Sequence, residues 1–399
     1  MTRQAPRLDD FDPGTARRIA MTVSCTDADA IPKVEGAGQI RDHGGRRVQV
    51  MHNGLIVEEG GYYGAWMTEV IRTLQGHHEP QEERVFDAIV RRLRDDGAPC
   101  VMIEFGSFWA YYSLWFCHTL PGSRAVALEP DFPYLGVGRR NAALNGFSDR
   151  ITFFHAAIGA QPGHLLAFPA ESDGQPHEVV QHDLASLMKA ANLERVDLVL
   201  ADVQGAETVL LERARGDLQA GRVRFLIVST HHHSISGDPL THQRALSLLL
   251  DAGAHVISEH SVAESFSGDG LIAVSFDARD NDFVVPVSHA RSKDSLFGEL
   301  EVDLAAARRQ CTDAEQAARA ARDQVDRLDD QLRRLTAERD ALGAQLAQSI
   351  EAREALDAQC AGLIEARDAL RTEIDAITGT KVWRWAQGPR DLYGRVRRP

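Results

Sequence analysis

The sequence predicts an α/β protein built on a parallel sheet with helices on both faces, followed by a long α-helical coiled coil. Between residues 101 and 276, short apolar runs typical of buried strands alternate with helical segments, an order that forms a parallel sheet. Several of these runs end on an acidic residue or a histidine, and ligands bind at that edge of such sheets. A heptad repeat of apolar residues then extends from Phe297 to Ile377 without a proline, which predicts the coiled coil.

Composition limits the classes of protein to which the chain can belong. The 399 residues, of which 44% are hydrophobic, are enough for two or three domains with a real core. A formal net charge of −14 argues against a nucleic-acid partner. No apolar run has membrane-spanning length, and the first residues lack the apolar core of a signal peptide. The five cysteines have no metal-binding spacing, so we expect a cytoplasmic protein with reduced thiols and no metal site.

The chain divides into five segments. Residues 1–46 are polar and weakly periodic, and we expect a loose arm there. A hairpin and helices are expected at residues 47–98, and they lead into a sheet domain at residues 99–290. The coiled coil covers residues 295–378, and a basic, aromatic tail covers residues 379–399.

The segment before the sheet carries a hairpin signal and a helix start. Two apolar runs from Val48 to Val57 surround Asn53-Gly54, the pair that best fits a type I′ turn. The stretch from Gly76 to Glu83 marks a helix start, with Pro80 in the first turn and acidic residues near the positive end of the helix dipole. This acidic, histidine-bearing turn either closes over a cofactor or an acceptor, or it is simply the capped start of a surface helix.

The stretch from Val101 to Glu129 predicts a nucleoside-binding β-loop-α-β unit. Val101 to Phe105 reads as a buried strand, and Gly106 suits a tight strand-to-helix turn. The second strand ends at Glu129, where nucleotide-binding sheets meet ribose hydroxyls. The loop at 106–110 has one glycine and two bulky aromatic residues, so it suits a pyrophosphate poorly and S-adenosylmethionine better. The alternative is a strand-to-helix turn that binds nothing.

Further strand ends bring chemically active side chains to the same edge of the predicted sheet. We expect the later strands at residues 151–155, 196–202, 224–230, 254–259 and 271–276. The carboxyl ends of parallel strands lie together, and ligands bind there. The residues expected to converge at this edge are Glu104, Glu129, His155, Asp202 and His231.

Five sequence blocks between residues 100 and 260 follow one another in a specific order. They are Glu104-x-Gly106 with Tyr111-Tyr-Ser113, Glu129-Pro130, Asn141-x-x-x-Asn145-Gly146, Ala156-Ala-Ile-Gly159, and Val196-Asp-Leu with Asp202-Val-Gln-Gly-Ala-Glu207. In this order they resemble the FkbM family of S-adenosylmethionine-dependent methyltransferases. The resemblance implies a class I, Rossmann-like sheet of seven strands, the last antiparallel, and usually methyl transfer to a hydroxyl. The chain departs from the family at Ala110, where a second glycine is general, and at Leu200, where lysine is common.

Roles at the cofactor site follow from this resemblance. The expected cofactor-binding residues are Glu104, Gly106, Ser107, Glu129, His155 and Ala156. Gly106 and Ser107 would contact the methionine end of the cofactor, and Glu104 would hold its ammonium group. Glu129 would accept hydrogen bonds from the ribose, and the last two residues would flank the adenine ring.

The acceptor side needs a base if a hydroxyl is methylated, and histidine has a suitable pKa. We expect His231 or His232 to be that base, and Asp202 to orient the cofactor, the acceptor or the histidine. Three consecutive histidines cannot all face one site, so at least one is expected in solvent. A divalent ion held by Asp202, Glu207 and a histidine is an alternative, and another is that Glu207 only begins the next helix.

The heptad repeat predicts a homo-oligomer. Leucine occupies most d positions, while Arg339, Arg353 and Arg367 recur at a positions, where charge costs stability and fixes the register. A single helix about 120 Å long would leave these leucines in water, so we expect the chain to associate with itself. The choice between dimer and trimer and the orientation of the helices stay open.

The tail inverts the charge of the chain. Residues 381–399 hold six basic residues and one acid, with Trp383, Trp385 and Tyr393 between them. Such a composition suits an anionic membrane surface, and the pattern resembles the short tails that follow coiled coils in bacterial cell-surface glycosyltransferases and methyltransferases. We therefore expect peripheral contact with the inner membrane face, and the alternative is a basic tail that only aids solubility.

The prediction is a cytoplasmic, coiled-coil-oligomerised O-methyltransferase that uses S-adenosylmethionine. The expected acceptor is a hydroxyl of a sugar in a surface polysaccharide or glycolipid, and a small natural product is the same-class alternative. A non-catalytic scaffold with a degenerate methyltransferase domain is a second alternative, favoured by Ala110 and Leu200. The third is an NAD-dependent enzyme, which the single glycine of the loop disfavours.

Overall fold

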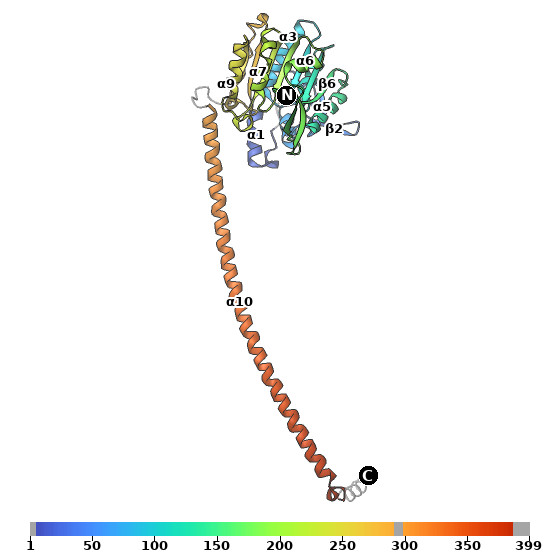
Figure 1. Ribbon diagram of the computed structural model, residues 1–399, viewed down its shortest axis with the longest axis vertical. Coiled ribbons are helices and arrows are strands. Elements are labelled where there is room, and N and C mark those ends of the chain that lie inside the picture. Colours follow the sequence, from blue (N-terminus) through green and yellow to red (C-terminus); the bar gives the residue numbers. More distant parts are fainter. Residues whose placement is uncertain (1–4, 291–297, 386–399) are drawn as a thin grey trace. The chain divides into compact units, whose positions relative to one another are not determined.

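The structure is a computed structural model that describes residues 5–290 and 298–385, with side chains from Asp303 onward in the second range. The chain divides into two compact units between Asp303 and Leu304. The first unit contains a folded α/β body, here called the head, and the second consists mainly of one long helix (Figure 1).

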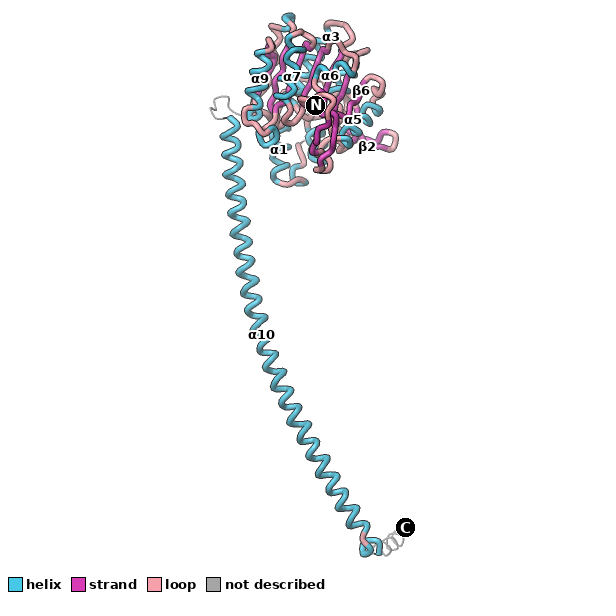
Figure 2. Tube along the Cα trace, in the orientation of Figure 1, coloured by secondary structure: helices cyan, strands magenta, loops and turns pink. Residues whose placement is uncertain are grey.

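The head is built around a nine-stranded sheet flanked by helices (Figure 2). Its strands are β4 (Val101–Phe105), β5 (Arg124–Glu129), β6 (Ile151–Ile158), β7 (Leu165–Pro169), β8 (Pro176–His182), β9 (Val196–Asp202), β10 (Val223–Thr230), β11 (His255–His260) and β12 (Gly270–Ser275). They follow the order β11-β12-β10-β9-β4-β5-β6-β8-β7, and β12 runs antiparallel to both of its neighbours. The part from β11 to β6 has the strand order of a class I methyltransferase, so this predicted fold class is confirmed.

A hairpin of β7 and β8 corrects the expectation of a sheet of seven strands. β8 pairs in parallel with the end of β6, where Val180 lies opposite Ala156, and β7 pairs antiparallel with β8. Most residues of β8 are exposed, so this edge strand lacks the apolar run by which a buried strand is identified in a sequence. The hairpin lengthens the sheet at its β6 edge.

Alternate residues of the central strands face two different cores. Met102 and Leu198 pack in the core on one face, whereas Ile103 and Val199 pack in the core on the other. Both side-chain sets are apolar because both faces are covered, which is why these strands read as continuous apolar runs.

Helices supply the outer half of each core. They are α3 (Pro80–Asp95), α4 (Tyr111–Thr119) and α5 (Phe132–Leu144) on one face, and α6 (Leu184–Ala190), α7 (Glu207–Gln219) and α9 (Thr241–Asp251) on the other. Helices alternate with the strands as the sequence predicts, and Pro80 stands in the first turn of α3 as predicted.

The prediction of a loose arm is wrong for the described part of residues 1–46. The helix α1 (Pro13–Ser24) begins at an N-cap formed by the Asp12 side chain. Ile19 of α1 is fully buried, and the hydroxyl of Thr22 donates to a carbonyl in the loop before β12 at 3.0 Å. The apolar periodicity of this segment is weak, and the contacts that hold the helix in place come from residues far along the chain. The local sequence therefore gave no sign of them.

The hairpin predicted at residues 48–57 is confirmed. A small sheet contains β1 (Ile40–His43), β2 (Arg46–Val50) and β3 (Ile56–Glu58), and β2 pairs antiparallel with β3. Only Gly54 of the predicted turn pair has a positive φ, 91°, so the connection is not the two-residue type I′ turn. The helix α2 (Gly64–Thr73) follows.

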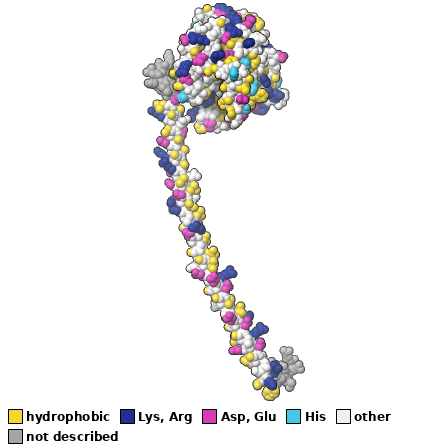
Figure 3. Space-filling view, in the orientation of Figure 1, with side chains coloured by type: hydrophobic (Ala, Val, Ile, Leu, Met, Phe, Trp, Pro, Cys, Tyr) yellow, Lys and Arg dark blue, Asp and Glu magenta, His cyan; other side chains and the backbone are white. Residues whose placement is uncertain are grey.

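The second unit contains all but the start of α10 (Gly298–Gly379), one continuous helix. Leu332, Leu335 and Leu342, which occupy heptad a and d positions, are 64%, 62% and 65% exposed in the single chain. Apolar side chains are interspersed with both signs of charge along the helix (Figure 3). The predicted long helix is confirmed, and its coiled-coil partner stays a prediction.

The tail is described only in part. Val382 and Trp385 are 76% and 80% exposed, and residues 386–399 of the predicted basic tail lie outside the described residues. Within the ranges that the structure describes, no helix is both long and apolar enough to cross a membrane.

The thiols of the two units differ in accessibility. Cys100 and Cys117 are buried in the head, and burial raises the pKa of each thiol to about 11. Cys311 and Cys360 are exposed on α10. A thiol with a raised pKa and little exposure reacts slowly, so the reactive thiols belong to α10.

Candidate active site

Two adjoining cavities lie in the head. The first chamber, about 490 Å³, lies at the carboxyl ends of β4, β5, β6 and β9. The second chamber, about 300 Å³, is lined by residues of α1, α2 and the loop before β12. Of the predicted site residues, five line the first chamber, namely Glu104, Gly106, Ser107, Glu129 and Asp202.

Gly106 forms the floor of the first chamber, where β4 turns towards α4. Its φ is +76°, and a Cβ built on it would lie 1.7 Å from the carbonyl oxygen of Asp202. Only glycine lets the loop after β4 pack this closely on the end of β9. The tight turn predicted at Gly106 is confirmed.

Ser107 presents an unused polar group beside this floor. The residue is 1% exposed, and its hydroxyl oxygen has no hydrogen-bond partner among the described residues. A buried polar group without a partner costs about 1–3 kcal/mol. A polar ligand group in the first chamber would remove that cost.

Glu104 lies at the end of β4, below the first chamber. Its carboxylate accepts hydrogen bonds from the amide of Ser113, at 3.0 Å, and from the Ser113 hydroxyl. Burial raises the pKa of Glu104 to about 8, against the effect of these bonds, and the charges of Asp202 and Glu129 add to the rise. At neutral pH the carboxyl is therefore mostly protonated, and a positive group bound beside it would favour its ionised form.

Glu129 occupies the corresponding position at the end of β5. It accepts hydrogen bonds from the amides of Phe108, at 2.9 Å, and Asp131, at 2.8 Å. Burial raises the pKa of Glu129 to about 8 although both bonds act in the opposite direction. The position suits a ribose diol, because hydroxyl donors find an acceptor fixed at a strand end.

An aromatic wall follows the floor. The rings of Phe108 and Tyr134 stack with centroids 3.6 Å apart.

The loop after β4 contains two non-glycine residues with left-handed backbone angles. Phe108 and Ala110 have positive φ values of 37° and 59°. A non-glycine residue in this region costs about 1–2 kcal/mol, so Ala110 retains the turn at a moderate cost where the resembled family has glycine.

The residues of β6 that line the first chamber lie further along the strand than the pair predicted to flank the adenine. His155 is exposed, and its Nε2 lies 2.9 Å from the carbonyl oxygen of Pro130. Ala156 is buried but does not line the chamber, whereas Ala157 and Ile158 do. The strand continues past its predicted end because it pairs with β8, and that pairing brings later residues to the cavity.

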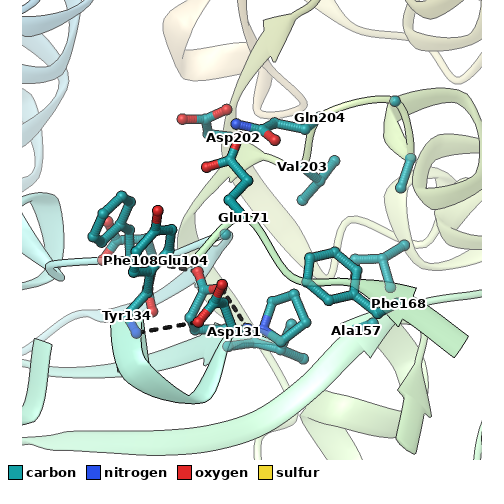
Figure 4. Close-up of a pocket in the computed structure, with 18 of the residues that line it drawn as sticks. Glu104, Phe108, Asp131, Tyr134, Ala157, Phe168, Glu171, Asp202, Val203 and Gln204 are labelled. Carbon is teal, nitrogen blue, oxygen red and sulfur yellow. Dashed lines mark hydrogen bonds between the residues drawn. The ribbon is translucent and has the colours of Figure 1, made fainter. Parts of the chain in front are cut away.

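The two chambers share a boundary, here called the throat. The seven residues that line both are Tyr62, Tyr63, His78, Glu79, Glu171, Asp202 and Gln204. The hydroxyl of Tyr63 donates to Glu171 at 3.2 Å and accepts from the Gln204 amide at 3.3 Å. Glu171, Asp202 and Gln204 lie together at one end of the first chamber in Figure 4. Groups bound in the two chambers would meet here.

Asp202 reaches the throat and is held by a buried histidine. His231 Nε2 lies 3.0 Å from Asp202 Oδ1, and His231 Nδ1 lies 2.5 Å from Glu207 Oε1. The side chains of His231 and Glu207 are 3% and 0% exposed, whereas that of Asp202 is 34% exposed. Burial lowers the pKa of His231, but the nearby carboxylates of Asp202, Glu207 and Asp269 outweigh it and raise that pKa well above its usual value. His231 is thus a cation paired with carboxylates at both nitrogens, rather than the free base that the sequence predicted.

His232 lines neither chamber, which corrects the alternative choice of base. Its Nδ1 accepts a hydrogen bond from the amide of Ser234 at 3.3 Å and caps the short helix α8 (His233–Ser236). Local capping turns the side chain away from the throat. The expectation that the three histidines do not all face one site is confirmed.

The turn before α3 supplies throat residues that the sequence analysis left between two interpretations. His78 and Glu79 line both chambers, and the hydroxyl of Tyr112 donates to Glu79 at 3.2 Å. The acidic, histidine-bearing turn was the available signal. Tyr62, which also lines both chambers, carries no signal in the sequence.

The second chamber has a wall that the sequence analysis missed. Thr15, Arg18 and Thr22 of α1 line it, and the Arg18 guanidinium lies over the ring of Trp66, 4.9 Å from its centroid. The prediction failed here because α1 was expected to be part of a loose arm.

The described residues around the throat do not support a metal ion. His231 stands between Asp202 and Glu207, which removes the arrangement considered for a divalent ion. A separate buried group of His52, His77 and Glu83 comes close together, but the two imidazoles stack with an interplanar angle of 17° and centroids 4.2 Å apart. Their in-plane lone pairs therefore run side by side instead of converging on an ion.

A family model described as "Methyltransferase FkbM domain" matches residues 96–266. The match covers β4 to β11 and includes Gly106, Glu129, Asp202 and His231. It confirms the resemblance drawn from the sequence blocks. The throat residues His78 and Glu79 and all of α1 precede the matched segment.

Solved structures with similarity to the chain include three methyltransferases. An O-methyltransferase from Bacillus cereus in complex with SAH has 17% identity and a TM-score of 0.33, and the match covers 48% of this chain and 80% of that one. A precorrin-6y C5,15-methyltransferase from Geobacter metallireducens has 17% identity and a TM-score of 0.31, with coverage of 48% and 86%. The N-terminal domain of human METTL16 in complex with SAH has 17% identity and a TM-score of 0.32, with coverage of 50% and 71%. No curated protein sequence matches the chain.

Proposed function

We propose that this chain, whose residues 96–266 form an FkbM methyltransferase domain, transfers a methyl group from S-adenosylmethionine to a hydroxyl of an acceptor. The observation that carries the proposal is the throat, where Asp202 borders both chambers. The first chamber would hold the cofactor and the second would hold the acceptor.

The residues of the first chamber fit this cofactor. Ser107 has a buried hydroxyl without a partner among the described residues, and Glu129 is a fixed acceptor at the end of β5. Glu104 and Asp202 add carboxyl groups that suit positive charge. S-adenosylmethionine, when bound, would supply an electrophilic methyl group on a sulfonium. Its lack of phosphates agrees with a loop of one glycine and two aromatic residues.

Asp202 is the group that we assign to the acceptor's proton. A hydroxyl loses its proton when its oxygen is methylated, and a carboxylate within reach can accept that proton. Asp202 is partly exposed in the throat, whereas both nitrogens of His231 are occupied by carboxylates. His231 and Glu207 would then hold Asp202 in place, which contributes to catalysis through positioning.

For the acceptor we propose a sugar hydroxyl, as in a surface polysaccharide or glycolipid. The second chamber supports this choice with aromatic residues and hydroxyl or carboxylate groups, including Tyr62, Trp66, Thr15 and Asp269. Sugars offer an apolar face for aromatic rings and a rim of hydroxyls for polar ones.

We also propose that α10 joins copies of the chain into a homo-oligomer. Its heptad leucines are about as exposed as side chains on a free helix, with Leu356 at 61% and Leu363 at 64%. A second α10 would cover this apolar row, as in coiled coils. Peripheral membrane contact through the tail remains part of the proposal, with Trp385 as its described support.

Calorimetric titration with S-adenosylhomocysteine tests the cofactor assignment. We expect micromolar binding by the full chain, and loss of that binding in Glu129→Ala. Glu212→Ala, at an exposed position of α7, is the matched control and should bind as the unchanged chain does. A folded chain that binds no S-adenosylhomocysteine would contradict the proposed function and favour a scaffold.

A further inference from the structure

Two carboxylate–imidazole–carboxylate relays meet at the throat. In the first relay, His78 Nδ1 lies 2.6 Å from Glu83 Oε1, and His78 Nε2 lies 3.3 Å from Glu79 Oε2. The side chains of Glu83 and His78 are 0% and 1% exposed, while Glu79 is 15% exposed and borders both chambers.

The second relay repeats this order with residues from another part of the chain. Glu207 is the buried glutamate, His231 the imidazole, and Asp202 the carboxylate that borders both chambers. In each relay Nδ1 faces the buried glutamate and Nε2 faces the throat. One relay comes from the turn before α3, and the other from the ends of β9 and β10 and the start of α7.

The charges within the first relay keep Glu79 ionised. Burial raises the pKa of Glu79, but the charge of His78 outweighs it and holds that pKa below its usual value. Burial also lowers the pKa of His78, and the charges and hydrogen bonds of Glu79 and Glu83 overcome this and raise it to about 10. Glu79 is therefore a fixed hydrogen-bond acceptor whose remaining lone pairs are available to the throat.

We propose that Glu79 and Asp202 bind two hydroxyl groups of one acceptor, so that the second chamber takes a polyhydroxylated molecule with neighbouring hydroxyls. Asp202 lies beside the hydroxyl that is methylated, and Glu79 beside its neighbour. This inference rests on the proposed function. It adds a specificity-determining residue, Glu79, that precedes the matched family domain.

The remaining lining favours a neutral polyol over an anionic acceptor. Four carboxylates line the second chamber, those of Glu79, Glu171, Asp202 and Asp269, against three cationic groups among its described lining residues, Arg18, His78 and His231. Both imidazoles are already paired with carboxylates, so a phosphate or carboxylate on the acceptor would face a small excess of negative charge. The rings of Tyr62, Tyr63 and Trp66 supply the apolar surface that the carbon skeleton of a polyol needs.

The test measures small-molecule binding to the full chain by saturation-transfer NMR, with and without S-adenosylhomocysteine. The probes are trans-1,2-cyclohexanediol, methyl α-glucopyranoside and cyclohexanol. The diol and the glycoside should bind roughly tenfold tighter than cyclohexanol. Each has a second hydroxyl that can donate to a carboxylate, and this additional hydrogen bond contributes about 1.5 kcal/mol. Glu79→Gln and Asp202→Asn keep the shape and should remove this preference, while Glu212→Gln on α7 should retain it.

Two outcomes would overturn the inference: equal binding of the diol and cyclohexanol, or a diol preference that survives Glu79→Gln. S-adenosylhomocysteine binding, titrated separately for each variant, distinguishes the two proposals. Absence of that binding contradicts the proposed function, whereas the probe preference measured without S-adenosylhomocysteine still decides whether the throat selects neighbouring hydroxyls.

Discussion

The head and α10 place similar side chains in opposite surroundings. Leu198 of β9 is fully buried between strands and helices of its own chain, whereas Leu335 of α10 is 62% exposed. The head buries its apolar groups against its own chain, whereas the apolar row of α10 is exposed in the single chain. Both chambers lie in the head. The difference teaches that the proposed ligand binding and the proposed self-association belong to separate parts of the chain.

Removal of residues 304–399 should have the largest effect, and it tests whether the head and α10 act independently. Because the unit boundary falls between Asp303 and Leu304, we expect self-association to be lost completely. The affinity for S-adenosylhomocysteine should change less than about twofold, since every residue that lines the two chambers precedes Leu304. Sedimentation and calorimetry measure the two effects on one preparation. Self-association that persists, or cofactor binding that disappears, would show that the two parts are not separable.

Gly106→Ala sharpens the comparison from the side of the head. The new Cβ would collide with the Asp202 carbonyl, so the loop after β4 must move and affinity for S-adenosylhomocysteine should fall on the order of 100-fold, about 3 kcal/mol. Gly216→Ala is the matched control, because nothing lies within 4 Å of a Cβ at that helical position. It should leave affinity unchanged and stabilise α7 by about 0.5–1 kcal/mol. Equal affinity in both variants would refute the close packing of β4 on β9.

Two leucine truncations test burial directly. Leu198→Ala leaves a cavity in the head and should lower its free energy of unfolding by about 2–5 kcal/mol. Leu335→Ala should leave that free energy unchanged and instead weaken self-association. Chemical denaturation followed by the fluorescence of head tryptophans gives the first quantity, and a dilution series gives the second. A destabilised head in Leu335→Ala would contradict independent units.

The pH dependence of cofactor binding is the last way to sharpen the comparison, and it belongs to the head alone. Burial raises the pKa of Glu129 to about 8 in the unliganded chain, so the carboxyl carries a proton at pH 6 and must lose it to accept ribose hydroxyls. Affinity for S-adenosylhomocysteine should therefore rise with pH, by up to tenfold per unit for one released proton, and level off above about 8. Glu129→Gln should remove one proton from the release measured by calorimetry in buffers of different ionisation enthalpy. Affinity that is flat or falls between pH 6 and 8 would contradict this sign.

Local sequence was enough for the floor of the site. Gly106, Glu129 and Asp202 stand at strand ends that are visible as apolar runs, and the order of those strands follows from the βαβ pattern. Their convergence could therefore be predicted without contacts.

Other parts of the site depend on partners far apart in the chain. The end of β6 depends on pairing with β8, which moved the chamber-lining residues from Ala156 to Ala157. The protonation of His231 depends on Glu207 and Asp202 together, so residue type alone suggested a base. The wall formed by α1 was invisible because its contacts bridge more than 200 residues, as between Thr22 and Phe266.

The difference in thiol exposure between the head and α10 allows α10 alone to be labelled. Maleimide reagents should label Cys311 and Cys360 and leave the buried thiols of the head unmodified. The two labelled sites are separated by roughly 75 Å along the helix axis. If helices associate in parallel, spin labels on Cys360 alone would give one short distance between copies, and an antiparallel pair would give a much longer one. Replacing Cys311 leaves Cys360 as the exposed thiol for this measurement. The orientation of the coil can therefore be determined without any substitution near the chambers.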